Sequence, residues 1–450
     1  MNLADILKED GKLCECGKNH YALVKKTVIE EGAINKAPEL VKAELVKAEG
    51  AGSVFMICDL NTYDVAGEKA EKLFTEAGIT VKKYVLKTRE VIEPDEHAVG
   101  SVMMDYQDCD MIVSVGSGVI NDVGKIVAAA CKKTYMIIGT APSMDGYASG
   151  TSSMVRGGHK VTITSKCPDI VVGDLDILCN APMDMLRSGV GDMLAKYISI
   201  CEWRIGRIVC GEYYCEKVAE MVRQALREVV SLAPGLMKRD KEAVKAVMNG
   251  MVLSGIAANY ATISRPVSGD EHYFSHVWDM RGLAFGTPIY FHGIQCGAAT
   301  IDVLRVYEIL KNVTPDKQKG IDYCKNFDMQ EYYAKLREFM GAGAEAMIAE
   351  NEKDHKYLPE THSVRIERIV EHWDEILQIM EDELDLADAI STLKITGAPD
   401  CSAALGKTNE ELAKTFVFSK DIRDKYVAAR ICWDLGIIDE VTEKMYGCKV

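Results

Sequence analysis

The segment DMIVSVGSGVINDVGK, residues 110–125, runs from an apolar, β-rich stretch through a glycine-containing turn directly into a helical pattern. Other apolar runs precede and follow it, and the chain between the early runs has helical periodicity, as in VAGEKAEKLFTEAG at 65–78. These runs are SVFMICD (53–59), KKYVLK (82–87), TYMIIGTAP (134–142) and DIVVGD (169–174). Alternating buried strands and helices are typical of βα units around a parallel sheet. We therefore predict an α/β, Rossmann-like dinucleotide-binding domain over residues 1–180.

The second half of the chain has a different pattern, in which the strand signal fades and long helical periodicity takes over. Examples are EYYCEKVAEMVRQALREVV (212–230), QEYYAKLREFMGAGAEAMIAENEK (330–353) and HSVRIERIVEHWDEILQIMEDELD (362–385). Turn-forming residues at 180–182 mark the change. A chain of 450 residues has room for two or three domains. We predict an all-α domain over residues 181–450.

The composition excludes several classes of function. With 53 basic and 68 acidic residues the formal net charge is −15, so the long-range field repels nucleic acid and anionic membranes. The 15 cysteines are odd in number and scattered, which favours a reducing compartment over a disulfide framework. No apolar run is long enough to span a membrane, and the N-terminus lacks a secretory segment. We therefore expect a cytoplasmic protein without membrane insertion.

One cysteine pattern near the start of the chain calls for its own interpretation. Cys14, Cys16 and His20 form a C-x-C-x3-H arrangement. We interpret it as an opening strand or turn rather than a metal site, because it offers no fourth ligand and departs from C-x2-C spacing. A redox role stays open.

Two loops at strand ends are candidate cofactor sites. In VGSGVINDVGK, residues 115–125, Gly116 and Gly118 lie where a strand passes into a helix N-terminus, so backbone N–H groups can approach a pyrophosphate. Asn121 stands where the dinucleotide fingerprint has its third glycine, and a structural tight turn is the alternative. The second loop, GTAPSMDGYASG at 139–150, also follows a strand. Since ligands of open parallel sheets bind beyond the carboxyl ends of the strands, the two loops are expected to build one site.

Polar side chains near these loops are candidate ligand contacts. Asp59 ends the first strong strand, where its carboxylate can accept a ribose hydroxyl, and the alternative is a helix cap for a segment that begins at Asn61 or Thr62. Asp145 lies in the second loop and is directed to the same edge of the sheet. The hydroxyl side chains of this loop that are expected to bond the cofactor are Thr140, Ser143 and Ser149.

Three of the nine histidines lie in SGDEHYFSHVWDMRGLAFGTPIYFHGIQCG, residues 268–297. His272 and His276 share a helix face at i and i+4, so both could bind one ion, and spacing favours this pair slightly. Alternatively His272 pairs with His292, which leaves His276 beside the substrate. Core or surface histidines are the third possibility.

A carboxylate elsewhere in the chain could complete this set. Asp192 lies in the apolar helical run SGVGDMLAKY at 188–197, where a buried carboxylate needs a partner. Lys196, four residues on, is one candidate and a metal ion is the other. Two imidazoles and one carboxylate would leave coordination positions open for a substrate, as in catalytic zinc sites.

Taken in order, these motifs resemble the glycerol-1-phosphate dehydrogenases, within the iron-containing alcohol dehydrogenase and dehydroquinate-synthase-like superfamily. The matching motifs are GSGxxND (116–122), TAPSxDGxxS (140–149), GDxLAK (191–196), SRPxSGxEHxFSH (264–276) and HGxQxG (292–297). The segment at 264–276 is the most specific. Towards the C-terminus, LKITGAP (393–399) and SKDIRDKYVAARICWDLGIID (419–439) look like the longer bacterial, arabinose-operon-associated members. The chain departs from the superfamily in reading GSG where GGG is common.

The resemblance implies a role for each candidate. It makes Asp192, His272 and His292 the metal ligands, and it places His276 and Asp145 at the substrate, against the slight preference from spacing. The ion could be zinc, nickel or iron. It also implies NAD(H) or NADP(H) as cofactor and a homodimer or larger homo-oligomer. The positions that map onto cofactor contacts are Asp59, Gly116, Ser117, Gly118, Val119, Ile120, Asn121, Asp122, Thr140, Ala141, Pro142, Ser143 and Ser149.

The implied reaction is reversible reduction of dihydroxyacetone phosphate to sn-glycerol 1-phosphate. A metal ion would stabilise the developing alkoxide, and His276 could pass the proton through a relay. Arg265 and Lys160 are candidates for the substrate phosphate, with ordinary surface cations as the alternative. Rival functions are an unphosphorylated polyol (glycerol) dehydrogenase, a dehydroquinate-synthase-like lyase that uses NAD transiently, and a non-catalytic regulator.

Overall fold

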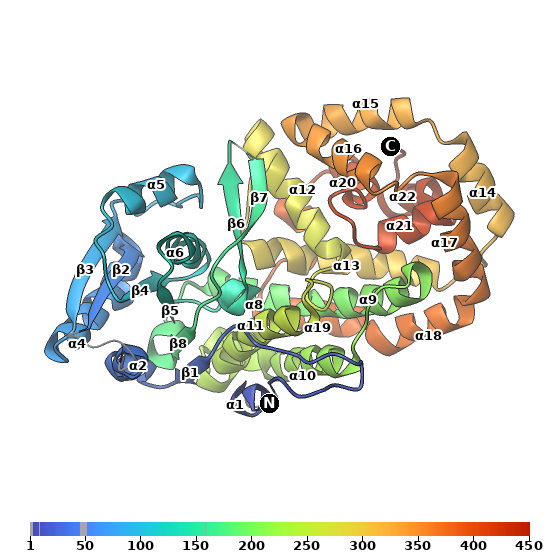
Figure 1. Cartoon of the computed structure of the whole chain (residues 1–450). Helices are drawn as coiled ribbons and strands as arrows, with labels where there is room; N and C mark the ends of the chain where they lie inside the picture. The colour runs from blue at the N-terminus through green and yellow to red at the C-terminus, as the bar shows by residue number, and fades with distance from the viewer. Residues whose placement is uncertain (1–2, 9, 46–51, 158) are drawn as a thin grey trace. The chain divides into compact units, whose positions relative to one another are not determined.

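The computed structural model describes residues 3–8, 10–45, 52–157 and 159–450 (Figure 1). The chain folds into two compact units, one formed by residues 1–193 and 220–262, the other by residues 194–219 and 263–450. The first contains the parallel sheet and the second is helical, which confirms the predicted α/β part followed by an α-helical part. The proposed boundary at residue 180 stays a prediction, and residues 180–182 form the turn before helix α8 (Met183–Leu194).

The sheet of the first unit has six parallel strands in the order β1-β8-β5-β4-β2-β3. The strands are β1 (Lys26–Glu30), β2 (Ser53–Asp59), β3 (Thr80–Leu86), β4 (Met111–Gly116), β5 (Thr134–Gly139) and β8 (Ile170–Asp174). The central strands β4 and β8 are buried throughout, as their continuous apolar runs predict. All five predicted strands are confirmed.

Three strands escaped the sequence analysis. β1 lies at the edge of the sheet and is only half-buried, so it has no continuous apolar run. The other two, β6 (Thr151–Arg156) and β7 (His159–Thr164), form an antiparallel hairpin whose hydroxyl-rich sequence hid its strand character.

Helices cover the sheet and build the core of the first unit. Apolar side chains of α2 and α4, such as Val41 and Phe74, pack with sheet residues such as Val113, and all three are fully buried. The helices of this unit are α1 (Leu3–Leu7), α2 (Ala37–Leu45), α3 (Leu60–Thr62), α4 (Glu68–Glu76), α5 (Glu96–Met104), α6 (Gly118–Cys131), α7 (Leu175–Leu178), α8 and α11 (Lys241–Ala261). The unit also has the short 3-10 segments η1 (Ala33–Lys36), η3 (Asp145–Ala148) and η4 (Ala233–Lys238) and the π-helical segment η2 (Tyr63–Gly67).

The second unit consists of helices and two short 3-10 turns within the described residues. They are α9 (Lys196–Cys210), α12 (Asp270–Phe285), α13 (His292–Leu310), α14 (Lys317–Asn326), α15 (Met329–Met340), η5 (Gly341–Gly343), α16 (Ala344–Lys353), α17 (Pro359–Glu371), α18 (Trp373–Glu383), α19 (Leu386–Thr396), η6 (Ser402–Leu405), α20 (Asn409–Ser419), α21 (Ala428–Asp434) and α22 (Ile438–Tyr446). Helix α10 (Glu216–Leu232) has residues in both units.

Two of the long helical stretches are each divided. The stretch at 330–353 breaks at η5, because Gly341 has a φ of +58°, which a helix interior does not allow. The stretch at 362–385 breaks at His372, between α17 and α18. The helical character of both stretches is confirmed, and only their continuity is wrong.

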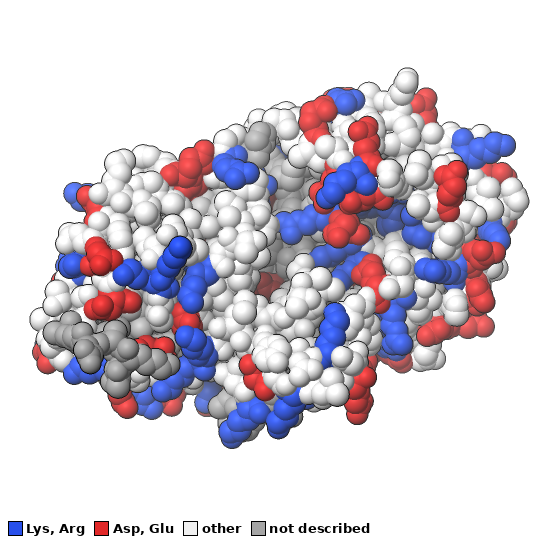
Figure 2. Space-filling model, viewed as in Figure 1, with Lys and Arg blue, Asp and Glu red and all other residues white. Residues whose placement is uncertain are grey.

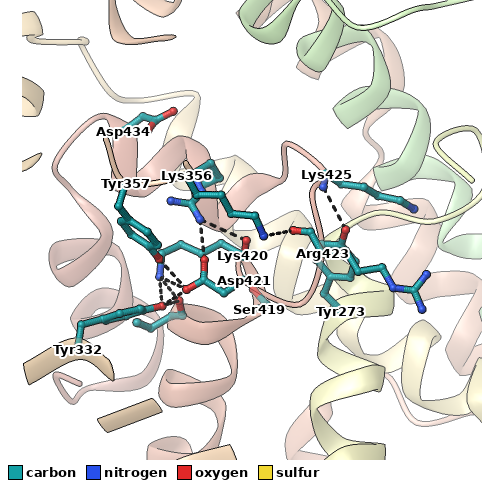
Figure 3. Close-up of polar contacts among 12 residues, drawn as sticks. Tyr273, Tyr332, Lys356, Tyr357, Ser419, Lys420, Asp421, Arg423, Lys425 and Asp434 are labelled. Atoms are coloured by element: carbon teal, nitrogen blue, oxygen red, sulfur yellow. Dashed lines mark hydrogen bonds and ion pairs between the residues drawn. The ribbon is translucent and has the colours of Figure 1, made fainter. Parts of the chain in front are cut away.

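A network of buried charges ties the C-terminal segment SKDIRDK, residues 419–425, into the second unit (Figure 3). The carboxylate of Asp421 accepts hydrogen bonds from Tyr332, from Tyr357 at 2.6 Å and from Arg430 at 2.7 Å. Burial lowers the pKa of the neighbouring Lys420 to about 7. This polar core gives the segment one defined conformation.

The same C-terminal region packs on the segment that carries two of the histidines. Lys425 Nζ donates to the carbonyl oxygen of Ser268 at 2.6 Å, and the backbone N–H of Ala429 donates to Asp270 at 3.0 Å. Residues 157 and 159 positions apart in the sequence are thus fixed against each other near the start of α12.

On the face drawn in Figure 2, basic and acidic side chains are interspersed. Within the residues that the structure describes, no helix is both long enough and apolar enough to cross a membrane.

Candidate active site

The glycine loop lies at the carboxyl end of β4, as predicted. Gly116 ends the strand, Ser117 is the N-cap residue, and α6 begins at Gly118. A Cβ on Gly116 would lie 2.5 Å from the Cβ of Ile120, so only glycine fits there. The positive end of a 14-residue helix therefore follows the strand directly, an arrangement that can bind a pyrophosphate.

Asn121 has a structural task that its replacement of a fingerprint glycine did not reveal. Its side-chain NH2 donates to the carbonyl oxygen of Gly146 at 3.2 Å, and its side-chain oxygen accepts from Tyr135 Oη at 3.0 Å. Lys125, which is fully buried, also donates to Gly146 O, at 3.2 Å. Helix α6 thus holds the second predicted loop, so the structure brings the two loops together.

The other predicted cofactor positions divide into buried and half-buried ones. Ser143 is buried, and its carbonyl oxygen accepts from Ser188 Oγ of α8 at 2.7 Å. Ser149 is half-buried and its hydroxyl lies 2.9 Å from that of Thr151. Asp122 pairs with Lys125 at 2.8 Å. The remaining loop positions are Val119 and Ile120 in the first turn of α6 and the buried Thr140, Ala141 and Pro142 after β5.

Asp59 caps a helix. Its carboxylate accepts from the backbone N–H of Thr62 at 2.7 Å, and the Thr62 hydroxyl accepts from the backbone N–H of Asp59 at 3.0 Å. This reciprocal capping box confirms the alternative considered from sequence, with the helix beginning at Leu60. A ribose contact of Asp59 stays a prediction.

Asp192 belongs to the first unit, lies near the end of α8 and is fully buried. One of its carboxylate oxygens accepts from the backbone N–H of Asp145 at 2.9 Å. Two predicted site residues are therefore joined, and Asp192 fixes the backbone where η3 begins. Lys196, the other candidate partner, begins the next helix and donates from Nζ to Val267 O at 2.9 Å.

The histidines lie in the second unit, on α12 and at the first residue of α13. The rings of His272 and His292 are 5.1 Å apart between centroids. The ring of His276 stacks near that of His292, at 6.1 Å and an interplanar angle of 28°. The structure thus brings all three histidines together and places His272 next to His292.

Both rings of this pair are oriented by neighbours. His272 Nδ1 lies 2.7 Å from a carboxylate oxygen of Glu271, and His292 Nδ1 lies 3.2 Å from Ser275 Oγ. Metal-binding histidines commonly have such an outer partner on one nitrogen, which directs the other nitrogen to the ion. The oriented imidazoles of His272 and His292 are therefore suitable ligands for a divalent cation.

The outer partners are themselves held in place. The side-chain amide of Gln295 donates to Ser275 Oγ at 3.0 Å and to Asp279 at 2.8 Å. Glu271 accepts a bond from the backbone N–H of Gly269 at 2.8 Å, and burial raises the pKa of the Glu271 carboxyl to about 7. Glu271 of the SGxEH motif thus orients the ring of His272, and Gln295 of the HGxQxG motif orients the ring of His292 through Ser275.

Cys296 is a neighbour that the sequence analysis missed. Its sulfur lies 3.5 Å from His292 Nε2, and it has a place with His272 and His292 in a group of donor atoms all within 4.8 Å of one another. The H-x3-C spacing on one helix face was the signal that could have found it.

The two basic candidates for a substrate phosphate have different surroundings. Arg265 is buried, pairs with Glu212 and donates to the carbonyl oxygen of Tyr426 at 2.9 Å. The alternative of a surface cation is therefore wrong for Arg265, and protein groups already engage its guanidinium. Lys160 is half-buried on β7, opposite Val155 of β6.

Sequence comparison places these features in a known family. The chain is 31% identical over 299 residues, 66% of its length, to glycerol-1-phosphate dehydrogenase (NAD(P)+) of Halalkalibacterium halodurans, of which it covers 74%. The chain belongs to the glycerol-1-phosphate dehydrogenase family. It is 30% identical to the enzyme of the same name from Bacillus licheniformis, covering 69% of this chain and 77% of the relative. Residues 28–182 match the iron-containing alcohol dehydrogenase family. As a member of this family the protein is an oxidoreductase.

Solved structures show the same fold at lower identity. A glycerol dehydrogenase from Schizosaccharomyces pombe superposes with a TM-score of 0.57 at 16% identity, covering 94% of this chain and 90% of the other. A 1,3-propanediol oxidoreductase gives a TM-score of 0.58 at 16% identity, covering 95% of this chain and 100% of the other. The chain therefore shares the fold of these two enzymes.

Proposed function

We propose that this enzyme catalyses the reversible reduction of dihydroxyacetone phosphate to sn-glycerol 1-phosphate with NADH or NADPH. Family membership supports the reaction, and one observation carries the chemistry: His272 and His292 adjoin each other, each with an outer partner on Nδ1. Asp192 is the proposed third ligand for a divalent metal ion, zinc, nickel or iron, because it is a fully buried carboxylate within the GDxLAK motif.

A divalent cation, when bound, supplies Lewis acidity towards the C2 oxygen of the substrate. The side chains and backbone of the protein bind the cofactor, orient the substrate and transfer protons. The N-terminus of α6 binds the pyrophosphate of the cofactor through backbone N–H groups, and Gly116 permits the close approach. Asp145, whose backbone is fixed by Asp192, orients the substrate hydroxyl groups. His276, half-buried beside His292, transfers a proton at its ring nitrogen to or from the substrate oxygen through a hydroxyl or water relay.

One observation keeps a second substrate class in view, an unphosphorylated polyol such as glycerol. Arg265, the buried cation of the most specific motif, is engaged by Glu212. This leaves Lys160 as the remaining basic candidate for a phosphate group.

The test follows NADH and NADPH absorbance in metal-stripped enzyme that is resupplied with zinc, nickel or iron. We expect metal-dependent oxidation of NADH or NADPH when dihydroxyacetone phosphate is the substrate, and much slower oxidation with dihydroxyacetone. The product should be chiral, with its phosphate on the sn-1 carbon. Equal efficiency on both ketones would select the polyol dehydrogenase, and absence of net cofactor oxidation would select a lyase.

Variants separate the metal site from general stability. We expect His292→Ala to abolish metal-dependent turnover, and Glu271→Gln to weaken metal affinity by about 10- to 100-fold, because the amide orients His272 less well. His372→Ala is the matched control, since its side chain is 43% exposed at the junction of α17 and α18. Full turnover in His292→Ala would refute the metal mechanism.

A further inference from the structure

The N-terminal segment of residues 10–22 is a tight hairpin, as the sequence analysis expected of a strand or turn. Leu13 pairs with Asn19 in an antiparallel bridge, and the backbone N–H of Cys14 donates to Lys18 O at 2.9 Å. Gly17, at a φ of +84°, closes the turn. Three further bonds fix the base of the hairpin: Gly11 N to His20 O at 2.7 Å, Asn19 Nδ2 to Gly11 O at 2.9 Å, and Ala22 N to Asp10 at 2.6 Å.

This hairpin exposes its large apolar side chains and buries cysteine and histidine side chains. Its large apolar residues are outside, with Leu13 74% exposed and Tyr21 59% exposed. Cys14 and His20 are buried instead, and Cys16 is half-buried. A short hairpin without an apolar face is not stable by itself, and small folds of this kind are commonly held by a metal or by disulfides.

The three inward side chains present potential ligand atoms to one another. The sulfur atoms of Cys14 and Cys16 and a ring nitrogen of His20 all lie within 4.8 Å of one another. The sulfur of Cys16 is 3.4 Å from His20 Nε2. Two ligands of a tetrahedral zinc ion, with Zn–S of about 2.3 Å and Zn–N of about 2.0 Å, lie roughly 3.5 Å apart. The spacing of these two atoms thus matches that of two zinc ligands.

The imidazole of His20 is oriented as metal-binding imidazoles are. Its Nδ1 lies 2.9 Å from the carbonyl oxygen of Tyr260, near the end of α11, and its ring stacks on that of Tyr260 at 5.3 Å. A hydrogen bond from Nδ1 to a backbone carbonyl fixes the tautomer and leaves Nε2 as the ligand atom. The contact also joins the hairpin to a long helix of the same unit.

Contrary to the interpretation from sequence, which excluded a metal here, we propose that Cys14, Cys16 and His20 bind a structural zinc ion, with a fourth ligand that completes the tetrahedron. The ion replaces the missing apolar face of the hairpin and fastens it, through His20, to the C-terminal end of α11. This zinc is separate in role from the metal proposed for catalysis and would stabilise the fold of the first unit. The soft thiolate pair favours zinc over magnesium or manganese.

The competing explanation is a hydrogen bond between the Cys16 thiol and His20, which requires no metal. Metal analysis of the full-length protein distinguishes the two. We expect the double variant Cys14→Ser/Cys16→Ser, purified in the presence of zinc, to contain one equivalent of zinc less than the wild type. Cys131→Ser is the matched control, since Cys131 is an equally half-buried cysteine of the same unit, and should retain the wild-type content. An unchanged zinc content in the double variant would overturn the proposal.

A second measurement on the wild type covers the case in which the double variant does not fold. Cysteines are alkylated in zinc-loaded and in chelator-treated protein and then mapped by mass spectrometry. We expect zinc to protect Cys14 and Cys16 and to leave the alkylation of Cys131 unchanged. Cys296 lies beside His292 and reports on the proposed catalytic metal, so a protected cysteine other than Cys296 identifies the fourth ligand. Cobalt in place of zinc should give a thiolate-to-metal absorption band that Cys16→Ser weakens. Equal alkylation of Cys14 and Cys16 with and without zinc would contradict the site.

Discussion

Single residues decide how this chain tolerates buried charge. Asp421 is satisfied by Arg430 and two tyrosines, whereas Asp302 of α13 is buried with one carboxylate oxygen that has no hydrogen-bond partner in the described structure. Desolvation by burial raises the pKa of Asp302 from its usual 3.8 to about 6. A buried acid with a raised pKa lowers the free energy of unfolding at neutral pH, because the folded protein must hold a charge that burial disfavours.

The pH dependence of stability should reveal this residue. As pH rises above 4 the unfolded chain loses the Asp302 proton first, so the free energy of unfolding falls until about pH 6, and the loss persists at higher pH. Urea unfolding at pH 4.5 and pH 7.5 gives the free energy of unfolding of Asp302→Asn relative to wild type. We expect this relative free energy to be about 2 kcal/mol higher at pH 7.5 than at pH 4.5. The exposed Asp354→Asn should show no such pH-dependent difference. A gain that is the same at both pH values would contradict this role of Asp302.

Elements meet at close range beside the second loop. Gly189 in α8 lies so near the loop after β5 that an added Cβ would be 2.0 Å from the carbonyl oxygen of Pro142 and 2.5 Å from Val247 Cγ1. Since the first neighbour is backbone, a larger residue must displace the loop that carries Ser143. The position of this proposed cofactor loop therefore depends on one small residue of a helix.

Two glycine-to-alanine variants test this packing. We expect Gly189→Ala to destabilise the protein by about 1–3 kcal/mol and to weaken NADH binding in a fluorescence titration, because the loop must move. Gly100→Ala in α5 is the control, since its Cβ would meet nothing within 4 Å, and it should stabilise by about 0.5–1 kcal/mol. Unchanged stability and NADH affinity in Gly189→Ala would show that the loop yields without cost.

At the scale of the whole molecule, the chain passes between the two units three times. Residues 220–262 return to the first unit, where α11 packs on η3: Asn259 Nδ2 donates to Ala148 O at 2.9 Å, and a Cβ on Gly255 would lie 2.7 Å from the carbonyl carbon of Ala148. The sheet-containing unit is therefore not a continuous N-terminal segment.

This organisation predicts the behaviour of a truncated chain. We expect the fragment of residues 1–193 to lack a cooperative unfolding transition, because it omits α11, whose fifteen buried residues help to form the core of the first unit. Thermal unfolding followed by circular dichroism measures this, with the full-length chain as the reference. A sharp transition in the fragment would show that the segment 220–262 is dispensable.

The sequence by itself determined five of the six strands of the parallel sheet, the general helical character and the motifs. A buried parallel strand must be apolar throughout, and a glycine at a crowded strand end cannot be replaced, so both are visible in the order of the residues. The resemblance to a family rested on the same local motifs. Asp59 as a cap, Gly116 in its tight turn and the grouping of three histidines all followed from short-range patterns.

Only the tertiary structure decided which of several chemically equivalent partners a side chain meets. Spacing slightly favoured His272 with His276, and the fold places His272 next to His292 by packing α12 against α13. The fold likewise places Arg265 against Glu212, Asn121 against the second loop and His20 against Tyr260. Such pairings depend on contacts between segments distant in the chain, and periodicity along a sequence carries no information about which distant segment arrives.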